Sequence, residues 1–193
     1  MKKRSYQQNC SLALSSDLLC ERWTLLIFRE LLIQPCRFKD LNIWLKGMGT
    51  NLLSQRLKDL EQQGLIKKLN PKDKRSAYQL TDAGLAVEPI LLELIRWGLS
   101  ALAAVESYKH FHHWDLLAMK ALFQVQNCTA SLTIQFDHPE LQAWVKGSPQ
   151  GFSFSMGLTT SADIVLQQTI AELRANKKTI KDPNLKLFLA YFE

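Results

Sequence analysis

Four polar side chains recur along residues 51–62 at the spacing of a helical face. Asn51, Gln55, Lys58 and Gln62 are three or four residues apart, so a helix would place them on one side. Amide side chains can pair with adenine through two hydrogen bonds, and a lysine can reach guanine acceptors or phosphate oxygens. We interpret the stripe as a surface that could read base edges in a DNA groove.

The opposite side of the same segment is apolar. Leu53, Leu57 and Leu60 follow one another at spacings of four and three residues, so a helix would turn them together toward a core. A polar outer face is also what any surface helix shows. The stripe alone therefore does not separate a groove-reading helix from a solvated one, and the neighbouring elements must decide.

Helical patterns and a glycine turn come before this segment. Three stretches with apolar residues on one side predict helices over residues 11–19, 23–33 and 37–45. Residues 46–49 contain two glycines and predict a turn. Thr50 can cap the helix that follows, and Gly64 is placed to end it in a left-handed conformation.

A hairpin and a longer helical stretch come after it. Alternation over 65–69 and 77–80 predicts two short strands around a charged turn. Helix is expected from Thr81 to about Val105, with a kink or break at Pro89. Two short helices around a glycine turn, followed by a two-stranded wing, are typical of the winged helix-turn-helix. In that arrangement the second helix enters the major groove and the wing lies along the backbone or the minor groove.

The charge of the chain is uneven. The formal net charge is +6; residues 1–100 hold 16 Lys and Arg against 10 Asp and Glu, whereas residues 101–193 hold 8 of each. The whole excess thus falls in the first half, which favours a polyanionic partner there. Many basic surfaces do no more than interact with water, so charge supports the pattern without proving it.

The winged pattern assigns DNA contacts to nine side chains, six on the helices and three at the hairpin tip. They are Arg37, Thr50, Asn51, Ser54, Gln55, Lys58, Lys72, Lys74 and Arg75. The three basic residues of the tip are candidates for phosphates or the minor groove, and the alternative is a solvated turn. Arg56 lies toward the edge of the buried face, where we expect it to pair with an acid such as Glu30 or to reach a phosphate.

Several linked motifs resemble the HxlR-type transcriptional regulators over roughly residues 10–98. They are Cys10, Trp23-Thr24-Leu25-Leu26-Ile27, Arg29-Glu30-Leu31, Arg37-Phe38-Lys39-Asp40-Leu41, the run from Leu53 to Glu61, Gly64-Leu65-Ile66, Tyr78-Gln79-Leu80-Thr81 with Gly84, and Trp97-Gly98. The resemblance implies a cytoplasmic prokaryotic homodimer, held by the first helix and the helix after the wing. Such a dimer would bind a pseudo-palindromic operator in double-stranded DNA.

The chain departs from this family at two places. Cys20-Glu21 stand where the family usually has a Gly-Gly pair, so the turn there could be less sharp, and Gly49-Thr50 replace a Ser-Pro opening of the recognition helix. Some members of the family sense oxidants or electrophiles through a cysteine that aligns with Cys10, whose pKa a helix N-terminus and the basic residues 2–4 could lower. The alternative is an inert small residue in a dimer interface.

The second half predicts a separate α+β domain. Alternation over 130–136 indicates a half-buried strand, 141–145 and 152–156 could add others, and an apolar helix is expected over 185–192. The stretch Ala162-Asp163-Ile164 with the helix after it, and a short strand over 178–182, faintly resemble the sterol-carrier-protein-like fold. That resemblance implies a cavity for an acyl chain or a similar apolar ligand, lined by Phe136, Trp144, Phe152, Phe154 and Met156. The alternative is that these side chains fill a small core.

Other classes of function have little support in the sequence. No apolar run reaches the roughly 18 residues of a membrane span, and no secretory signal pattern opens the chain. The four cysteines lack CxxC spacing, which favours reduced thiols. His110, His112 and His113 are close in sequence, but Asp115 is the one further ligand nearby, so we expect no metal. No serine elbow, phosphate loop or dinucleotide fingerprint occurs, and we expect no cofactor, no catalytic residue and no enzyme.

Together these patterns predict a mainly α fold with small sheets. A winged helix-turn-helix domain for DNA binding and dimerisation is expected over residues 1–106, and a smaller α+β ligand-binding domain over 107–193. The expected function is a cytoplasmic, homodimeric, sequence-specific transcriptional regulator, most simply a repressor, that responds to a small apolar ligand or to oxidants. The alternative is a lipid- or small-molecule-binding protein whose winged helix mediates protein contacts.

Overall fold

The computed structural model describes residues 5–101, 110–176 and 179–192. The chain divides into two compact units, residues 1–91 and 92–193. This division cuts one helix, α6 (Glu88–Ala101). The boundary predicted from the sequence, between residues 106 and 107, lies outside the described residues. Helices and two small sheets make up the described part, as the sequence predicted.

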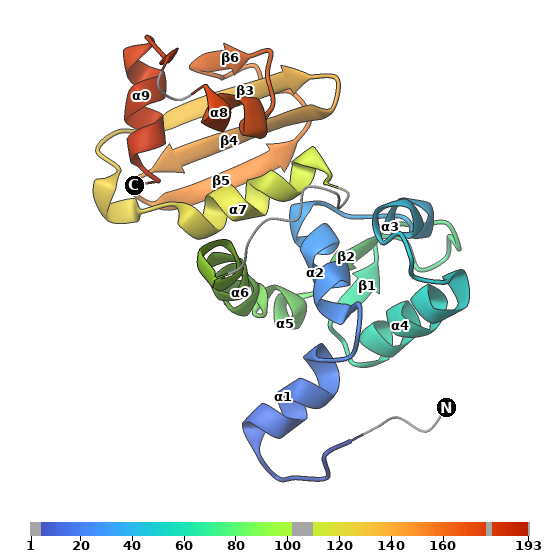
Figure 1. Cartoon of the computed structure of the whole chain (residues 1–193). Helices are drawn as coiled ribbons and strands as arrows, with labels where there is room; N and C mark the ends of the chain where they lie inside the picture. Colours follow the sequence, from blue (N-terminus) through green and yellow to red (C-terminus); the bar gives the residue numbers. More distant parts are fainter. Residues whose placement is uncertain (1–4, 102–109, 177–178, 193) are drawn as a thin grey trace. The chain divides into compact units, whose positions relative to one another are not determined.

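The first unit consists of helices and one hairpin (Figure 1). Its elements are α1 (Ser11–Leu19), α2 (Thr24–Ile33), α3 (Phe38–Trp44), α4 (Thr50–Gln62), β1 (Ile66–Lys68), β2 (Tyr78–Leu80), α5 (Asp82–Leu85) and the start of α6. The helix expected from Thr81 is broken between α5 and α6. Pro89 stands in the first turn of α6, where a missing backbone N–H is tolerated.

One apolar cluster joins these elements. It takes buried side chains from α2, α3, α4, both strands and the first turn of α6, among them Ile27, Phe28, Leu31, Leu41, Leu45, Leu53, Leu57, Leu60, Ile66, Leu80 and Leu91. Burying a side chain of this size contributes about 1.5–3 kcal/mol. The unit is therefore held mainly by the packing of amphipathic helices onto one another and onto the hairpin.

The hairpin is fastened to the helices by backbone hydrogen bonds. β1 and β2 pair antiparallel, with Ile66 opposite Leu80. Between α2 and α3, the N–H of Cys36 donates to the carbonyl of Tyr78 (3.0 Å), and the N–H of Tyr78 donates back (2.8 Å). This bridge adds a third extended segment to the hairpin. The wing thus cannot move away from the start of α3 without breaking two hydrogen bonds.

A glycine allows the close packing of α5 against the turn after α4. A Cβ built on Gly84 would lie 2.1 Å from the carbonyl oxygen of Leu65, nearer than any real side chain comes. The hydroxyl of Thr81 completes this joint, since it accepts a hydrogen bond from the N–H of Gly84 (3.2 Å) and donates to the carbonyl of Gly64 (2.5 Å). The left-handed Gly64 (φ +70°) ends α4, as predicted.

The second unit contains a four-stranded sheet with helices. Its elements are the end of α6, the 3-10 turns η1 (His112–Trp114) and η2 (Val125–Asn127), α7 (Asp115–Leu122), β3 (Leu132–His138), β4 (Leu141–Ser148), β5 (Gly151–Met156), β6 (Ile164–Leu166), α8 (Ile170–Ala175) and α9 (Pro183–Ala190). The strand order is β5-β4-β3-β6, with β6 parallel to β3 and the other neighbours antiparallel. Helices α8 and α9 cover one face of this sheet (Figure 1).

One element of the sterol-carrier resemblance is absent. The strand expected over 178–182 does not form in its described residues, 179–182. Asp182 instead caps α9, where its carboxylate accepts the N–H of Leu185 (2.9 Å), and Pro183 occupies the first helical position. This pair is a strong helix start, which explains why the chain turns into a helix here. Among the described helices, none has the length and apolar character needed to cross a membrane.

The Gly84 contact leads to a stability prediction. Replacing Gly84 with alanine should lower the free energy of unfolding by about 1–3 kcal/mol, because the new methyl group collides with backbone rather than with a side chain that could move. The measurement is urea unfolding followed by circular dichroism. Gly98→Ala in α6 is the matched control, since a Cβ there meets nothing within 4 Å. The control should leave stability unchanged or raise it by up to about 1 kcal/mol. Equal losses in both variants would contradict the assigned contact.

Candidate nucleic-acid interface

Helix α4 has two clearly different faces. Leu53, Leu57 and Leu60 are buried in the core of the first unit, while Asn51 and Lys58 are exposed on the other side. Thr50 is the first helical residue and does not cap the helix. Gly49 takes the capping position with extended backbone (ψ 144°), so the expected cap by Thr50 is wrong. Glycine is tolerated there because it leaves the first N–H groups open to water or to a ligand.

The stripe on α4 is partly ordered before any ligand arrives. The amide nitrogen of Gln55 donates to a carboxylate oxygen of Asp59 at 2.8 Å. One amide hydrogen is thereby used, while the other and the side-chain oxygen are left for a base edge. Ser54 and Thr50 are exposed beside it. The exposed stripe therefore presents hydrogen-bond donors and acceptors, the kinds of group that pair with base edges in a major groove.

Arg56 pairs with acidic side chains, as expected, although not with Glu30. Its guanidinium lies 3.0 Å from a carboxylate oxygen of Glu21 and 3.9 Å from Asp59, and its side chain is only 13% exposed. Glu30, the acid suggested from the sequence, is buried and pairs with Arg29 instead. Glu21 is one of the residues that replace the family's glycine pair. The chain's departure from the pattern thus ties α4 to the turn before α2.

The turn between α1 and α2 is made without the glycine pair. Trp23 adopts the left-handed conformation (φ +78°), which is strained for a bulky side chain, and the N–H of Thr24 donates to the carbonyl of Glu21 (3.0 Å). A Cβ on Gly47 would lie 3.6 Å from the Trp23 ring. The indole therefore packs against the glycine turn that leads into α4, and helps to set where that helix begins.

The wing tip is built by its own polar groups. The N–H of Asn70 donates to the hydroxyl of Ser76 (2.7 Å), and the N–H groups of Lys72 and Arg75 donate to the side chains of Asn70 (3.1 Å) and Asp73 (2.8 Å). Such turns hold the backbone by short-range hydrogen bonds.

All three basic side chains of the tip are exposed. They are Lys72, Lys74 and Arg75. Arg37 is also exposed, and it caps α3, where its N–H donates to Asp40 (3.0 Å). The described structure therefore places all nine predicted DNA-contacting side chains on the surface of the first unit.

Comparison with known proteins agrees with this geometry. Residues 18–106 match the family model described as HxlR-like helix-turn-helix. Over 83 residues the chain is 39% identical to YvaP of Bacillus subtilis (strain 168), an uncharacterized HTH-type transcriptional regulator; the alignment covers 42% of this chain and 77% of YvaP.

The chain belongs to the HxlR-like helix-turn-helix family. It is also 32% identical over 83 residues to the HTH-type transcriptional regulator YodB of the same organism, covering 42% of this chain and 74% of YodB. A solved structure of a putative MarR-family regulator from Porphyromonas gingivalis W83 is 30% identical, with a TM-score of 0.46, and covers 51% of this chain and 99% of its own. Members of this HxlR-like family are DNA-binding regulators of transcription. Residues 107–193 lie beyond the matched range.

Two of the four cysteines of this HxlR-like chain are exposed. Cys10 directly precedes α1 and Cys20 follows it, whereas Cys36 and Cys128 are buried. The backbone N–H groups of Ala13 and then Leu12, at the start of α1, lower the pKa of the Cys10 thiol. Burial, and then the charge of Glu30, raise the pKa of Cys36 strongly. Exposure and a lowered pKa are the conditions that favour reaction of a thiol, and of these two only Cys10 meets both. Residues 2–4, also expected to act on it, lie outside the described residues.

The five candidate ligand-lining residues do not share one face of the sheet. Phe136 pairs with Ala143 and Ala143 with Met156, and paired residues point to the same side. The same register places Phe152 and Phe154 on that side, opposite Gly147 and Val145. Trp144 follows Ala143 directly and therefore points to the other face. The sequence missed this because the register of β4 was unknown.

Aromatic rings cover the face that carries the other four candidates. Phe123 lies 5.3 Å from Phe152 between ring centres, and Phe152 lies 5.9 Å from Phe192. A Cβ on Gly147 would come within 2.9 Å of the Phe123 ring and 3.1 Å of Tyr191. Phe136 is fully buried. Such ring-to-ring contacts favour the alternative that these side chains form a core, and the apolar-ligand cavity stays a prediction.

Proposed function

We propose that this chain is a homodimeric, sequence-specific DNA-binding regulator that represses transcription by occupying a pseudo-palindromic operator. The observation that carries the proposal is the division of α4 into a buried leucine face and an exposed face of amides and one lysine. Any surface helix shows a polar face, but α4 stands where a winged helix-turn-helix has its recognition helix, and its exposed face carries this set of hydrogen-bonding groups. A recognition helix needs it, because base edges present donors and acceptors in the major groove.

The wing supplies the second contact. A hairpin bonded to the start of α3 and ending in three exposed cations is suited to phosphates or a narrow minor groove. Phosphate contacts fix the register of a protein on DNA, and base contacts select the sequence. We therefore assign base reading to Asn51, Gln55 and Lys58, and backbone contacts to the wing.

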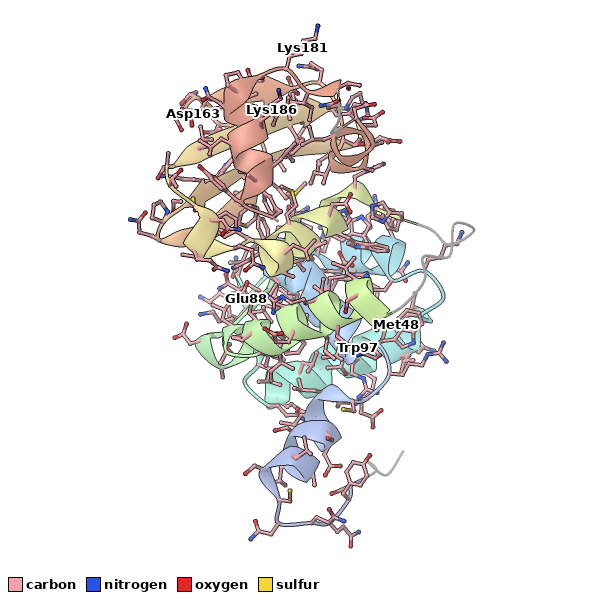
Figure 2. The ribbon with its side chains drawn as sticks, turned by 60° about the vertical axis from the view of Figure 1, so that its left-hand side comes forward. Met48, Glu88, Trp97, Asp163, Lys181 and Lys186 are labelled. Carbon is pink, nitrogen blue, oxygen red and sulfur yellow. The ribbon has the colours of Figure 1, made fainter. Side chains whose placement is uncertain are left out.

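Exposed apolar side chains support the proposed dimer. Ile90, Leu94 and Trp97 follow one another at spacings of four and three on α6, and Trp97 is 60% exposed (it is labelled in Figure 2). On α1, Leu12 is 75% exposed and Leu14 is 53% exposed. The apolar stripe on α6 and the exposed leucines on α1 are typical of surfaces that a second subunit covers. They lie on the two helices that the family resemblance implies for dimerisation.

The alternative function is a ligand-binding protein whose winged helix contacts other proteins. Salt titration of DNA binding separates the two. A dimer that makes about 6–8 phosphate contacts should lose affinity with a log–log slope of about −5 to −7. Fluorescence anisotropy with labelled promoter fragments measures this slope. Salt concentrations of about 50 to 300 mM suit the titration, because counterion release dominates the salt dependence of binding there. A flat slope, or no binding to any fragment, would favour the alternative.

Two substitutions test the division of roles. Lys58→Ala should reduce discrimination between operator variants by about 1–3 kcal/mol. Arg75→Ala should weaken binding to all sequences alike and reduce the salt slope by about 2, because the dimer loses one phosphate contact in each subunit. Lys186→Ala is the matched control, because Lys186 is an equally exposed cation on α9 in the second unit (labelled in Figure 2). It should change neither quantity. Equal effects of Lys58→Ala and Arg75→Ala would contradict the assigned roles.

We further propose that Cys10 makes operator binding sensitive to oxidants. Solved structures of YodB include reduced, diamide-treated and quinone-bound forms. In this chain the support is local: Cys10 is exposed and its pKa is lowered by the first N–H groups of α1. α1 also carries part of the apolar surface assigned to the dimer, so a modified Cys10 would lie beside that interface.

The thiol prediction has a pH readout. Because folding lowers the pKa of Cys10, its thiolate persists to lower pH in the native chain. Alkylation of Cys10, followed by peptide mass spectrometry, should therefore reach half its maximal rate at a lower pH in the native chain than in urea. Diamide should weaken operator binding in the wild type, and Cys10→Ser should remove that response while Cys20→Ser keeps it. An unchanged response in Cys10→Ser would end the idea.

A further inference from the structure

Two histidines and an aspartate meet at the start of the second unit. The ligand atoms of His110, His112 and Asp115 lie within 4.8 Å of one another. Nε2 of His110 is 3.1 Å from a carboxylate oxygen of Asp115. Imidazole nitrogen and carboxylate oxygen are ligands that first-row divalent metal ions accept together. The cluster therefore has the chemical composition of a metal site.

The hydrogen bonding of His112 also supports a metal site. Its Nε2 lies 2.9 Å from a carboxylate oxygen of Glu140, in the turn between β3 and β4. If Nε2 carries the proton for this contact, Nδ1 keeps its lone pair, and Nδ1 is buried with no hydrogen-bond partner among the described residues. Metal-bound histidines usually donate their second ring nitrogen to a carboxylate in this manner. An unused buried acceptor is otherwise unfavourable.

The fold holds these groups in place and leaves the cluster accessible to ions from solvent. His112 opens η1 and Asp115 opens α7, so both stand on ordered backbone. The Asp115 side chain is 12% exposed and that of His110 is 48% exposed, which leaves one side of the cluster open to solvent. An acidic side chain in the first turn of a helix is also a favourable position. An ion entering from solvent would meet His110 first.

We propose that His110, His112 through Nδ1, and Asp115 bind a divalent first-row transition ion, with Zn²⁺ as the ion of choice, and that Glu140 orients His112. Three protein ligands leave the fourth tetrahedral position to water. The sequence alone predicts no metal, since Asp115 is the one carboxylate near the histidines along the chain. Glu140 joins them only through the fold of β3 and β4. The proposal does not depend on DNA binding.

The test uses the full chain without a histidine tag, with Cys10 and Cys20 replaced by serine. These exposed thiols are removed because they could bind zinc themselves. Isothermal titration with Zn²⁺ should give one site per chain. Co²⁺ should give the visible absorption of a tetrahedral ion without thiolate-to-metal charge transfer. His112→Ala should weaken Zn²⁺ binding by about 100-fold or more, and Glu140→Gln by about 10–100-fold, since removing an outer carboxylate has effects of that size.

Controls keep the result interpretable. His110 has a half-exposed side chain, so loss of Zn²⁺ binding in His110→Ala would not reflect unfolding. Circular dichroism without metal checks the folding of every variant. Glu61→Gln removes an exposed carboxylate of α4 in the first unit, outside the cluster, and should leave the affinity unchanged. Absence of a Zn²⁺ site in the parent chain would overturn the proposal. So would equal losses of affinity in Glu61→Gln and His110→Ala.

Discussion

The burial of three leucines on α4 is the constraint on which the surface proposed to face DNA depends. Leu53, Leu57 and Leu60 are almost completely removed from solvent, and each makes the orientation of the helix more costly to change. A helix pinned along one side has its other side fixed by geometry, because successive residues advance by about 100°. The exposed amides and lysine are therefore a consequence of core packing and need no interactions of their own to stay in place.

Two further contacts fix the positions of the elements around α4. The pair of hydrogen bonds between Cys36 and Tyr78 carries the wing along with the start of α3, and the close approach of Gly84 to Leu65 joins α5 to the end of α4. The ion pair of Arg56 with Glu21 adds a link to the turn before α2. Each joint uses few atoms, but together they make the helix and the wing one rigid surface, which is what simultaneous contact with a groove and its phosphates requires.

In the second unit, the packed core and the polar cluster are separate. One face of its sheet is covered by aromatic rings, which contact one another in tilted and edge-to-face arrangements at centre distances of 5.3 to 6.4 Å in the described residues. The polar cluster of His110, His112, Asp115 and Glu140 lies in the same unit but belongs to its loops and helix starts. Packing and ligand chemistry thus occupy separate parts of this unit, as is common where a rigid sheet supports binding residues on its connections.

The sequence by itself determined the helices and strands of the first unit, because amphipathic periodicity, glycine turns and capping residues act over only a few positions. The same local signals marked the polar face of α4 and the left-handed end at Gly64. The tertiary structure alone decided which acid pairs with Arg56, which side of the sheet carries Trp144, and that Glu140 reaches His112. These depend on strand register and on turns that bring residues 28 to 35 positions apart into contact. No local pattern encodes such contacts, since they arise only when the whole core has closed.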